Sequence, residues 1–329
     1  MNQTKYKGSL LKGKSYSKTR ILITGASGFI GKHLISRLLM SNSKLICIDK
    51  NYGADFITNY GEKVDYHIGS IQDNKFLRRV LLKYSPDYII HLAGLKNRIN
   101  TRTEFEISMS INYFGTLNIL NAADEIKNLK RIVLMGTAEE YGNLKNIYTE
   151  DGKTDPSSAY GLSKLSASII GRIFYKLYGL PVVILRPSIA YGPGQGVEMF
   201  IPALIESLIK NKLFDMTPGD QYRNFIFVMD LINAIELTLN NDQCNGEIIN
   251  IGASQSVKLK DVAIHIASKL NKEHLLNIGT IPYRQFELMN YHLDVSKASE
   301  ILNWTPSFNF NDGINETTKY YLEKNDSPL

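Results

Sequence analysis

The stretch ILITGASGFIG, residues 21–31, decides the fold of this chain. It reads as a short buried strand, a turn with three glycines (Gly25, Gly28 and Gly31), and the first turn of a helix. In a parallel α/β sheet such a turn lets the backbone approach phosphate groups, and the helix N-terminus offers unpaired N–H groups to the anion. The stretch therefore predicts a pyrophosphate site at the beginning of a parallel sheet.

Apolar segments of strand length alternate with helical patterns through the first half of the chain. The predicted strands are rich in Ile, Leu and Val without polar alternation, which is typical of burial on both faces. The alternation predicts a doubly wound parallel α/β sheet that binds ligands at the carboxyl ends of its strands. The predicted strands are 20–24, 44–49, 64–68, 88–92, 131–135 and 182–186, and the predicted helices are 28–41, 73–83, 104–127 and 158–178.

The pattern changes after Pro187, where segments become shorter and prolines and glycines separate them. We therefore predict a basic flexible arm over residues 1–18, a Rossmann domain over 19–187 and a smaller C-terminal α/β substrate-binding domain over 188–329. Part of 225–251 is expected to return to the Rossmann sheet, because its last five residues resemble one more buried strand. The predicted helices of this half are 202–210, 228–239, 259–270, 296–302 and 312–321.

The net charge of +6 does not by itself indicate a nucleic-acid partner. Five lysines in residues 1–18 account for most of the excess, and no basic stretch is interleaved with aromatic residues. No apolar run reaches the length of about 18 residues that suggests a membrane helix. The first residues also lack the apolar segment of a secretory signal. We expect a cytoplasmic protein without a membrane segment.

Two cysteines, Cys47 and Cys244, are present in the sequence. Cys47 falls in an apolar strand pattern and Cys244 near a turn, so neither a disulfide nor a thiolate metal site is expected. His91 and the other histidines show no metal-ligand spacing, so no metal is predicted.

Asp49 closes the second predicted strand, 18 residues after Gly31. A carboxylate at this place can accept hydrogen bonds from the hydroxyls of an adenosine ribose. This favours NAD, because the 2′-phosphate of NADP would meet like charge, although Lys50 keeps NADP possible. The alternative is that Asp49 only begins a turn with Asn51 and Gly53. The strand, the glycines and the acid together predict a dinucleotide site.

Tyr160 and Lys164 stand four residues apart, a spacing that places both on one face of a helix. A free tyrosine has a pKa of about 10, and a neighbouring ammonium group favours its phenolate form. Such a pair can move a hydroxyl proton while hydride passes between a carbon atom and a nicotinamide. The alternative is an amphipathic helix with a half-buried tyrosine and a solvated lysine. The position after the glycine turn and five strands favours the catalytic interpretation.

The glycine spacing resembles that of the extended short-chain dehydrogenase/reductases, the nucleotide-sugar epimerase/dehydratase family. The resemblance continues along nearly the whole chain, through HLAG at 91–94 and NYFGT at 112–116, while Ser70 stands where the family usually has Asp. The family's cofactor contacts fall on Gly25, Ser27, Gly28, Phe29, Ile30, Gly31, Asp49, Ser70, Ile71, Leu92, Ala93, Gly94, Lys96, Asn112, Tyr160 and Lys164.

The same resemblance implies a catalytic role for Thr137, which would hydrogen-bond the reacting sugar oxygen and orient it toward Tyr160. Sugar 4,6-dehydratases of the family carry a glutamate at Glu139, which removes a proton next to a transient ketone. They often have an acidic residue just before it, but here that residue is Ala138, so the paired acid is absent. Glu140 is interpreted as a solvated loop charge.

Motifs in the second half imply contacts with a nucleotide-diphosphate sugar. Residues 217–225, TPGDQYRNF, resemble a family stretch whose arginine contacts the substrate diphosphate. Arg223 is expected in this role, because a guanidinium group suits phosphate oxygens. Gln195 closes the segment YGPGQ, which resembles a motif behind the nicotinamide. Arg284 is a second candidate contact, with a surface ion pair as the alternative.

These residues predict an NAD(P)-dependent enzyme with hydride transfer at C4 of a nucleotide-linked hexose. Ala138, and the resemblance of residues 94–96 to UDP-galactose 4-epimerases, favour an NDP-sugar 4-epimerase or 4-ketoreductase. An NDP-hexose 4,6-dehydratase is the alternative because of Glu139. The alternative of another class is a non-catalytic dinucleotide-sensing or RNA-binding Rossmann protein, which usually lacks the Tyr160–Lys164 pair.

A homodimer is also expected, because members of the family commonly associate through a four-helix contact. The predicted helices 104–127 and 158–178 would supply it. The alternative is that the sheet covers their apolar faces completely.

Overall fold

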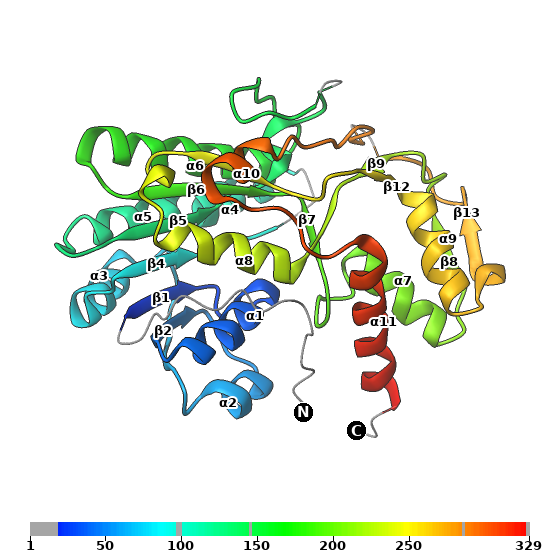
Figure 1. Cartoon of the computed structure of the whole chain (residues 1–329), viewed down its shortest axis with the longest axis horizontal. Helices are drawn as coiled ribbons and strands as arrows, with labels where there is room; N and C mark the ends of the chain where they lie inside the picture. The colour runs from blue at the N-terminus through cyan, green and yellow to red at the C-terminus, as the bar shows by residue number, and fades with distance from the viewer. Residues whose placement is uncertain (1–18, 97–100, 145–146, 285–286, 327–329) are drawn as a thin grey trace.

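Seven parallel strands form the central sheet of the computed structural model, which describes residues 19–96, 101–144, 147–284 and 287–326. All neighbouring pairs in this sheet run parallel, so the predicted doubly wound α/β sheet is confirmed (Figure 1). In spatial order the strands are β11 (Ile248–Ile251), β6 (Val182–Pro187), β5 (Arg131–Met135), β4 (Tyr88–His91), β1 (Arg20–Thr24), β2 (Lys44–Asp49) and β3 (Asp65–Ile68).

Helices cover both faces of this sheet. In β1, Ile21 and Ile23 enter the core on one face and Leu22 enters the core on the other. Because both faces bury apolar side chains, the strands show the continuous apolar runs seen in the sequence. The first face is covered by α1 (Phe29–Leu38), α8 (Val228–Leu239) and α10 (Ser296–Leu302), and the second by α3 (Asn74–Tyr84), α5 (Gly115–Ala123) and α6 (Ala159–Tyr178).

The helix predicted over 104–127 is interrupted in the structure. It consists of α4 (Arg102–Ser108), a π-helical turn η2 (Met109–Phe114) and α5. A π turn widens the helix by one residue, and such turns are frequent at functional sites. Here it places Asn112, a predicted cofactor contact, on the side facing the loop after β4.

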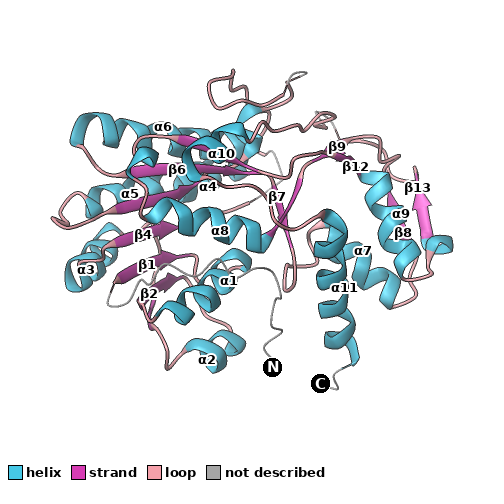
Figure 2. Cartoon of the chain, viewed as in Figure 1, coloured by secondary structure: helices cyan, strands magenta, loops and turns pink. Residues whose placement is uncertain are grey.

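A smaller body of short strands and three helices lies beside the sheet, on the right in Figure 2. Its apolar core includes Tyr191, Leu204, Phe227, Ile266 and Ile314. Two- and three-residue strands carry no periodic signal, and the sequence predicted none of them. They are β7 (Ile189–Tyr191) with β10 (Phe225–Phe227), β8 (Phe214–Met216) with β13 (Leu276–Ile278), and β9 (Tyr222–Arg223) with β12 (Val257–Lys258), and the helices are α7 (Phe200–Ile209), α9 (Leu259–Lys269) and α11 (Phe310–Asp326).

The chain passes between the two bodies more than once. After β10 it returns to the sheet as α8 and β11, and β11 pairs with β6 where the sequence predicted a returning strand. It returns again as α10, whose Ala298 and Leu302 join the core of the sheet. The second half of the sequence therefore builds part of the first body. The remaining short elements are α2 (Ala54–Tyr60), η1 (Leu39–Ser41), η3 (Ala138–Tyr141), η4 (Asp242–Cys244) and η5 (Glu273–Leu275).

The described residues include neither a membrane-spanning helix nor a metal-binding cluster. None of their helices combines the length and the apolar character that crossing a membrane requires. They also contain no group of three or more His, Cys, Asp or Glu side chains that could hold a metal ion. The predicted arm, residues 1–18, lies outside the described residues.

Candidate active site

The glycine turn after β1 packs too tightly for side chains at two of its positions. Gly25 has a φ of +69°, and a Cβ there would lie 2.6 Å from the Ala93 nitrogen in the loop after β4. A Cβ on Gly31 would lie 2.5 Å from the carbonyl oxygen of Gly25. These glycines let the turn, the first turn of α1 and the loop after β4 lie against one another.

The beginning of α1 is open to an anion. Gly28 is the N-cap residue, and no side chain caps the first N–H groups, which belong to Phe29 and the residues after it. The Asp49 carboxylate at the end of β2 accepts hydrogen bonds from the Ser27 nitrogen at 2.9 Å and the Ser27 hydroxyl at 2.8 Å. An uncapped helix N-terminus beside a fixed carboxylate fits the pyrophosphate and the adenosine ribose of a dinucleotide.

The predicted contacts on the adenine side differ in exposure. Ser70 follows β3 at the edge of the sheet, and its hydroxyl accepts a hydrogen bond from the Gln72 nitrogen at 3.2 Å. Ile71 is 4% exposed and packs against the first residue of α5, where a Cβ on Gly115 would lie 2.5 Å from it. Ile71 thus contributes mainly to the core below the site.

The loop after β4 is held by side chains of the site. The Ala93 nitrogen donates to the Thr24 hydroxyl at 3.2 Å, and the Leu92 nitrogen donates to the Thr24 carbonyl at 3.1 Å. Asn112 accepts a hydrogen bond from the Leu95 nitrogen at 2.7 Å and donates to the Leu95 carbonyl at 2.9 Å. Its amide also donates to Ser163 on α6 at 2.9 Å. Asn112 therefore fixes the loop relative to the helix that carries Tyr160.

Tyr160 and Lys164 lie on the first turns of α6, which begins after the N-cap Ser158. Lys164 is 7% exposed, and burial lowers its pKa to about 8, while the Glu140 carboxylate opposes this shift. A Cβ on Gly94 would lie 3.8 Å from the Lys164 ammonium nitrogen, so this group faces the loop after β4. The alternative of a solvated lysine is wrong.

Thr137 and Glu139 lie on the turn after β5. Thr137 is the N-cap residue of η3, and its hydroxyl accepts a hydrogen bond from the Glu139 nitrogen at 3.3 Å. The Glu139 side chain is 20% exposed and forms an ion pair with Lys96, at 3.8 Å between Oε1 and Nζ. The turn thus presents a hydroxyl and a carboxylate at the carboxyl edge of the sheet, where ligands of such folds bind.

The interpretation of Glu140 as a solvated loop charge is wrong, because its side chain is completely buried. Its carboxylate accepts hydrogen bonds from the Thr137 nitrogen at 2.9 Å and the Ser168 hydroxyl at 3.0 Å, and pairs with Arg186 at 2.7 Å. The tight η3 turn directs this side chain inward, between α6 and β6. Glu140 thereby joins the turn of Thr137 to the two neighbouring elements.

Tyr291 lies close to the candidate site, and the sequence did not predict it. It is 2% exposed and packs edge-on against Tyr148, with ring centres 5.7 Å apart. Burial raises its pKa well above 10, with a further contribution from the Glu139 carboxylate, and Arg223 and Tyr160 are also within electrostatic range. Tyr291 therefore lies among predicted catalytic and substrate residues. No motif marks it in the sequence.

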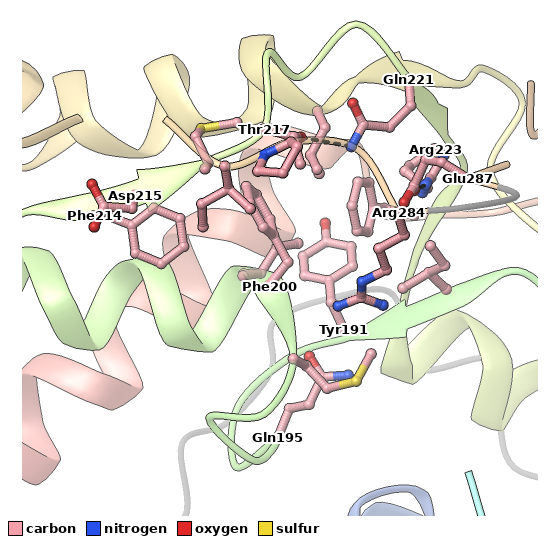
Figure 3. Close-up of a pocket in the computed structure, with 18 residues that line it drawn as sticks. Tyr191, Gln195, Phe200, Phe214, Asp215, Thr217, Gln221, Arg223, Arg284 and Glu287 are labelled. Carbon is pink, nitrogen blue, oxygen red and sulfur yellow. Dashed lines mark hydrogen bonds and ion pairs between the residues drawn. The ribbon is translucent and has the colours of Figure 1, made fainter. Parts of the chain in front are cut away.

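The predicted substrate residues Gln195, Arg223 and Arg284 line one cavity of about 230 Å³ in the smaller body (Figure 3). Arg223 pairs with Glu287 and donates to the Tyr222 carbonyl at 2.7 Å. Figure 3 shows the Arg284 side chain extending toward the ring of Tyr191. The Gln195 amide donates to the Ala190 carbonyl at 2.6 Å. Apolar walls with two guanidinium groups among the lining residues suit a nucleoside diphosphate.

The sequence matches a family model and known proteins along most of its length. A family model described as GDP-mannose 4,6 dehydratase matches residues 22–317. The dTDP-glucose 4,6-dehydratase of Haemophilus influenzae is 30% identical over 335 residues, which cover 92% of this chain and 97% of that protein. The chain spans only 48% of the length of two Arabidopsis thaliana relatives that it also matches.

Solved structures of two activities resemble the chain. A dTDP-glucose 4,6-dehydratase from Streptomyces venezuelae, solved with NAD, has a TM-score of 0.85 at 25% identity, covering 93% of this chain and 97% of that one. A UDP-glucuronic acid 4-epimerase from Bacillus cereus, solved with UDP-glucuronic acid and NAD, has a TM-score of 0.86 at 27% identity, covering 93% and 100%. The fold therefore does not distinguish a dehydratase from an epimerase. The residues of the site must make that distinction.

Proposed function

Since the chain belongs to the GDP-mannose 4,6 dehydratase family, we propose that it removes water from a nucleotide-linked hexose, with NAD as its cofactor. The residues alone favour a 4-epimerase or 4-ketoreductase, with a 4,6-dehydratase as the alternative. The relatives support the second interpretation, because a dTDP-glucose 4,6-dehydratase is 30% identical to the chain over nearly its full length. The observation that carries the proposal is the Glu139 carboxylate, beside Thr137 at the ligand edge.

The cofactor site would use the residues that form the cradle after β1. The first turn of α1 would bind the pyrophosphate, and Asp49 would bind the adenosine ribose. Asp49 favours NAD over NADP, because its carboxylate would repel a 2′-phosphate. When bound, the nicotinamide supplies the oxidising and then the reducing equivalent for the sugar carbons.

The chain's own residues would handle the protons. Tyr160 takes the proton of the C4 hydroxyl group, and the Lys164 ammonium favours its phenolate form. The Thr137 hydroxyl orients the sugar oxygen toward Tyr160. Once C4 is a ketone, the C5 proton becomes acidic, and the Glu139 carboxylate is the candidate base that removes it. Loss of the C6 hydroxyl group then gives a conjugated enone.

The substrate class follows from the cavity of the smaller body. Its apolar walls suit a nucleoside, and Arg223 and Arg284 would bind the diphosphate. The sugar would then extend toward Tyr291, which is in electrostatic range of both Arg223 and Tyr160.

A substrate panel tests the reaction type. The purified protein is incubated with NAD and with UDP-, dTDP-, GDP- and CDP-linked hexoses. The products are separated by chromatography, and their masses are measured by mass spectrometry. We expect at least one substrate to lose the mass of one water molecule. Loss of water from none of them, with a C4 epimer formed instead, would reject the dehydratase.

A 4-epimerase is the second candidate, and one observation favours it. Ala138 stands where dehydratases of the family often carry the acid that pairs with the glutamate. A 4-epimerase needs no such acid, because it neither breaks the C6–O bond nor removes the C5 proton. The same panel separates the two candidates, because dehydration lowers the product mass by one water, whereas a C4 epimer keeps the substrate mass and is resolved from the substrate by chromatography before the mass is read.

A homodimer is proposed from the surface of α4, η2 and α6, because α4 and α6 lie side by side and carry exposed apolar side chains. A twofold axis would pair this surface with its copy. The exposed apolar residues of this surface include Phe105, Ile107, Phe114, Leu162, Ile169 and Ile173.

We also propose that the protein is cytoplasmic. Both cysteines are free and buried, which suits a reducing compartment.

A further inference from the structure

We propose that Lys96 donates the proton to the departing C6 hydroxyl group and so replaces the acid that is missing at Ala138. This inference rests on the proposed dehydratase function. A hydroxide ion is a poor leaving group, so water elimination needs a proton donor as well as a base. Glu139 supplies the base, and the turn after β5 carries no second acid on that side.

Lys96 and Glu139 meet across two neighbouring strands of the sheet. Lys96 lies in the loop after β4 and Glu139 in the turn after β5, and these strands pair with His91 opposite Leu134 at their carboxyl ends. The ammonium nitrogen is 3.8 Å from the carboxylate oxygen Oε1. The side chains are 36% and 20% exposed, so both reach the open edge where the sugar would bind.

Two other protic groups of the described residues, Tyr160 and Tyr291, are less suitable donors. Tyr160 is already engaged with the C4 hydroxyl group in the proposed function. Tyr291 is 2% exposed and packs against Tyr148, whereas the Lys96 side chain is 36% exposed, so the ammonium group is the more accessible donor. Position 138 cannot contribute, because its methyl group is completely buried in a cluster with Tyr141 and Tyr148.

The step balances without an external oxidant or reductant. Glu139 takes the C5 proton, and the C5–H electron pair becomes the second bond between C5 and C6. The C6–O bond breaks, and its electron pair leaves with oxygen as hydroxide, which takes a proton from Lys96 and departs as water. Lys96 then regains a proton from solvent.

The pair also keeps the site electrically neutral. Before the step the carboxylate and the ammonium cancel, and after it both groups are uncharged. The reaction therefore never leaves an uncompensated charge in the half-buried site, which would be costly. Among the described residues, Lys96 is the cation that forms an ion pair with Glu139 and so balances its charge during the elimination.

The leaving group provides a direct test. Fluoride is a much weaker base than hydroxide and departs without a proton donor. The holoprotein and its K96Q, K96R and K153Q variants are compared on the hexose that the natural chain dehydrates and on its 6-deoxy-6-fluoro analogue. K153Q is the control, because Lys153 forms an exposed ion pair with Asp155 in another loop.

We expect K96Q to lower water elimination about 100-fold or more, while fluoride release stays within about threefold of the natural chain. K96R, which keeps the charge but is a much weaker acid, should resemble K96Q. K153Q should leave both rates unchanged. In D₂O, K96Q should still introduce deuterium at C5 of recovered sugar, because Glu139 is intact.

Three results would overturn the inference. An unchanged rate of water elimination in K96Q would show that another group is the donor. An equal loss with both leaving groups, together with NAD binding weakened about tenfold or more in a titration, would assign Lys96 to the cofactor instead. A natural chain that epimerises C4 and eliminates neither water nor fluoride would reject the proposed function as well.

Discussion

Glu140 illustrates what a single residue in the sequence does not reveal. Its partners Ser168 and Arg186 lie 28 and 46 residues away, and no local pattern links them to the turn after β5. Two adjacent glutamates suggest a charged loop, whereas in the structure Glu139 is half-buried and Glu140 is completely buried. Tyr291 was missed for a similar reason. By contrast, Tyr160, Lys164 and the glycines were found because their spacing alone encodes one helix face and one turn.

Replacing Glu140 should affect both stability and catalysis. The E140Q substitution leaves Arg186 buried without its counter-charge. It also weakens the hydrogen bond that the Thr137 nitrogen donates to the side chain at position 140. We expect a loss of about 3 kcal/mol in the free energy of unfolding, measured with urea. We also expect kcat to fall at temperatures where the variant remains folded, because the Thr137 turn moves.

Two controls separate these effects. E236Q breaks a half-buried ion pair between Arg37 and Glu236, away from the turn. It should cost less stability and leave kcat unchanged. The double variant E140Q/R186M should recover stability but not kcat, because it removes the unpaired charge without restoring the turn. Full recovery of kcat in the double variant would contradict a positioning role for Glu140.

Lys164 predicts a pH dependence of stability. Burial lowers its pKa in the folded chain from 10.5 to about 8. Between these values the unfolded chain holds the proton and the folded chain does not, so stability from this group rises with pH. It is fully present above 10.5 and is lost as the pH falls through about 8.

The slope is measurable by urea unfolding of the cofactor-free chain between pH 8 and 9.5. One group contributes at most about 1.4 kcal/mol per pH unit. K164M should remove this part of the slope. If the natural chain and K164M change in parallel over this interval, the amine does not titrate as its burial implies.

At the scale of elements, the sequence predicted the strands and helices that long apolar patterns indicate. Strands buried on both faces and amphipathic helices appear where they were predicted, within one or two residues at most ends. The short strands of the smaller body were not predictable, because their pairing depends on tertiary contacts. The helix over 104–127 was predicted as continuous, since a π turn leaves the apolar spacing almost unchanged.

The exposed faces of α4 and α6 predict a dimer. An apolar surface of this kind is unusual on a monomer, and a second copy would bury it. Placing a charge in it with I169E should convert a dimer into a monomer in size-exclusion chromatography with light scattering. The control I264E changes an exposed isoleucine on α9 and should leave the dimer intact. A natural chain that is monomeric at micromolar concentration would reject this surface as the interface.

At the scale of the whole molecule, the site is assembled from both halves of the sequence. The proposed cofactor cradle uses residues between 21 and 164, whereas the cavity is lined by residues between 189 and 287. Motifs could indicate each part separately, but other walls of the cavity, such as Phe200 and Phe214, follow from packing. The order of preference between epimerase and dehydratase also needed the relatives, since both activities occur on this fold.

If Glu139 removes the C5 proton so that water can leave, the mass of the product formed in D₂O reports that step. The natural chain should give a product that has lost one water and carries one deuterium at C5. The E139Q variant should give neither change. Dehydration by E139Q at the natural rate, or a C4 epimer of unchanged mass from the natural chain, would contradict this role of Glu139.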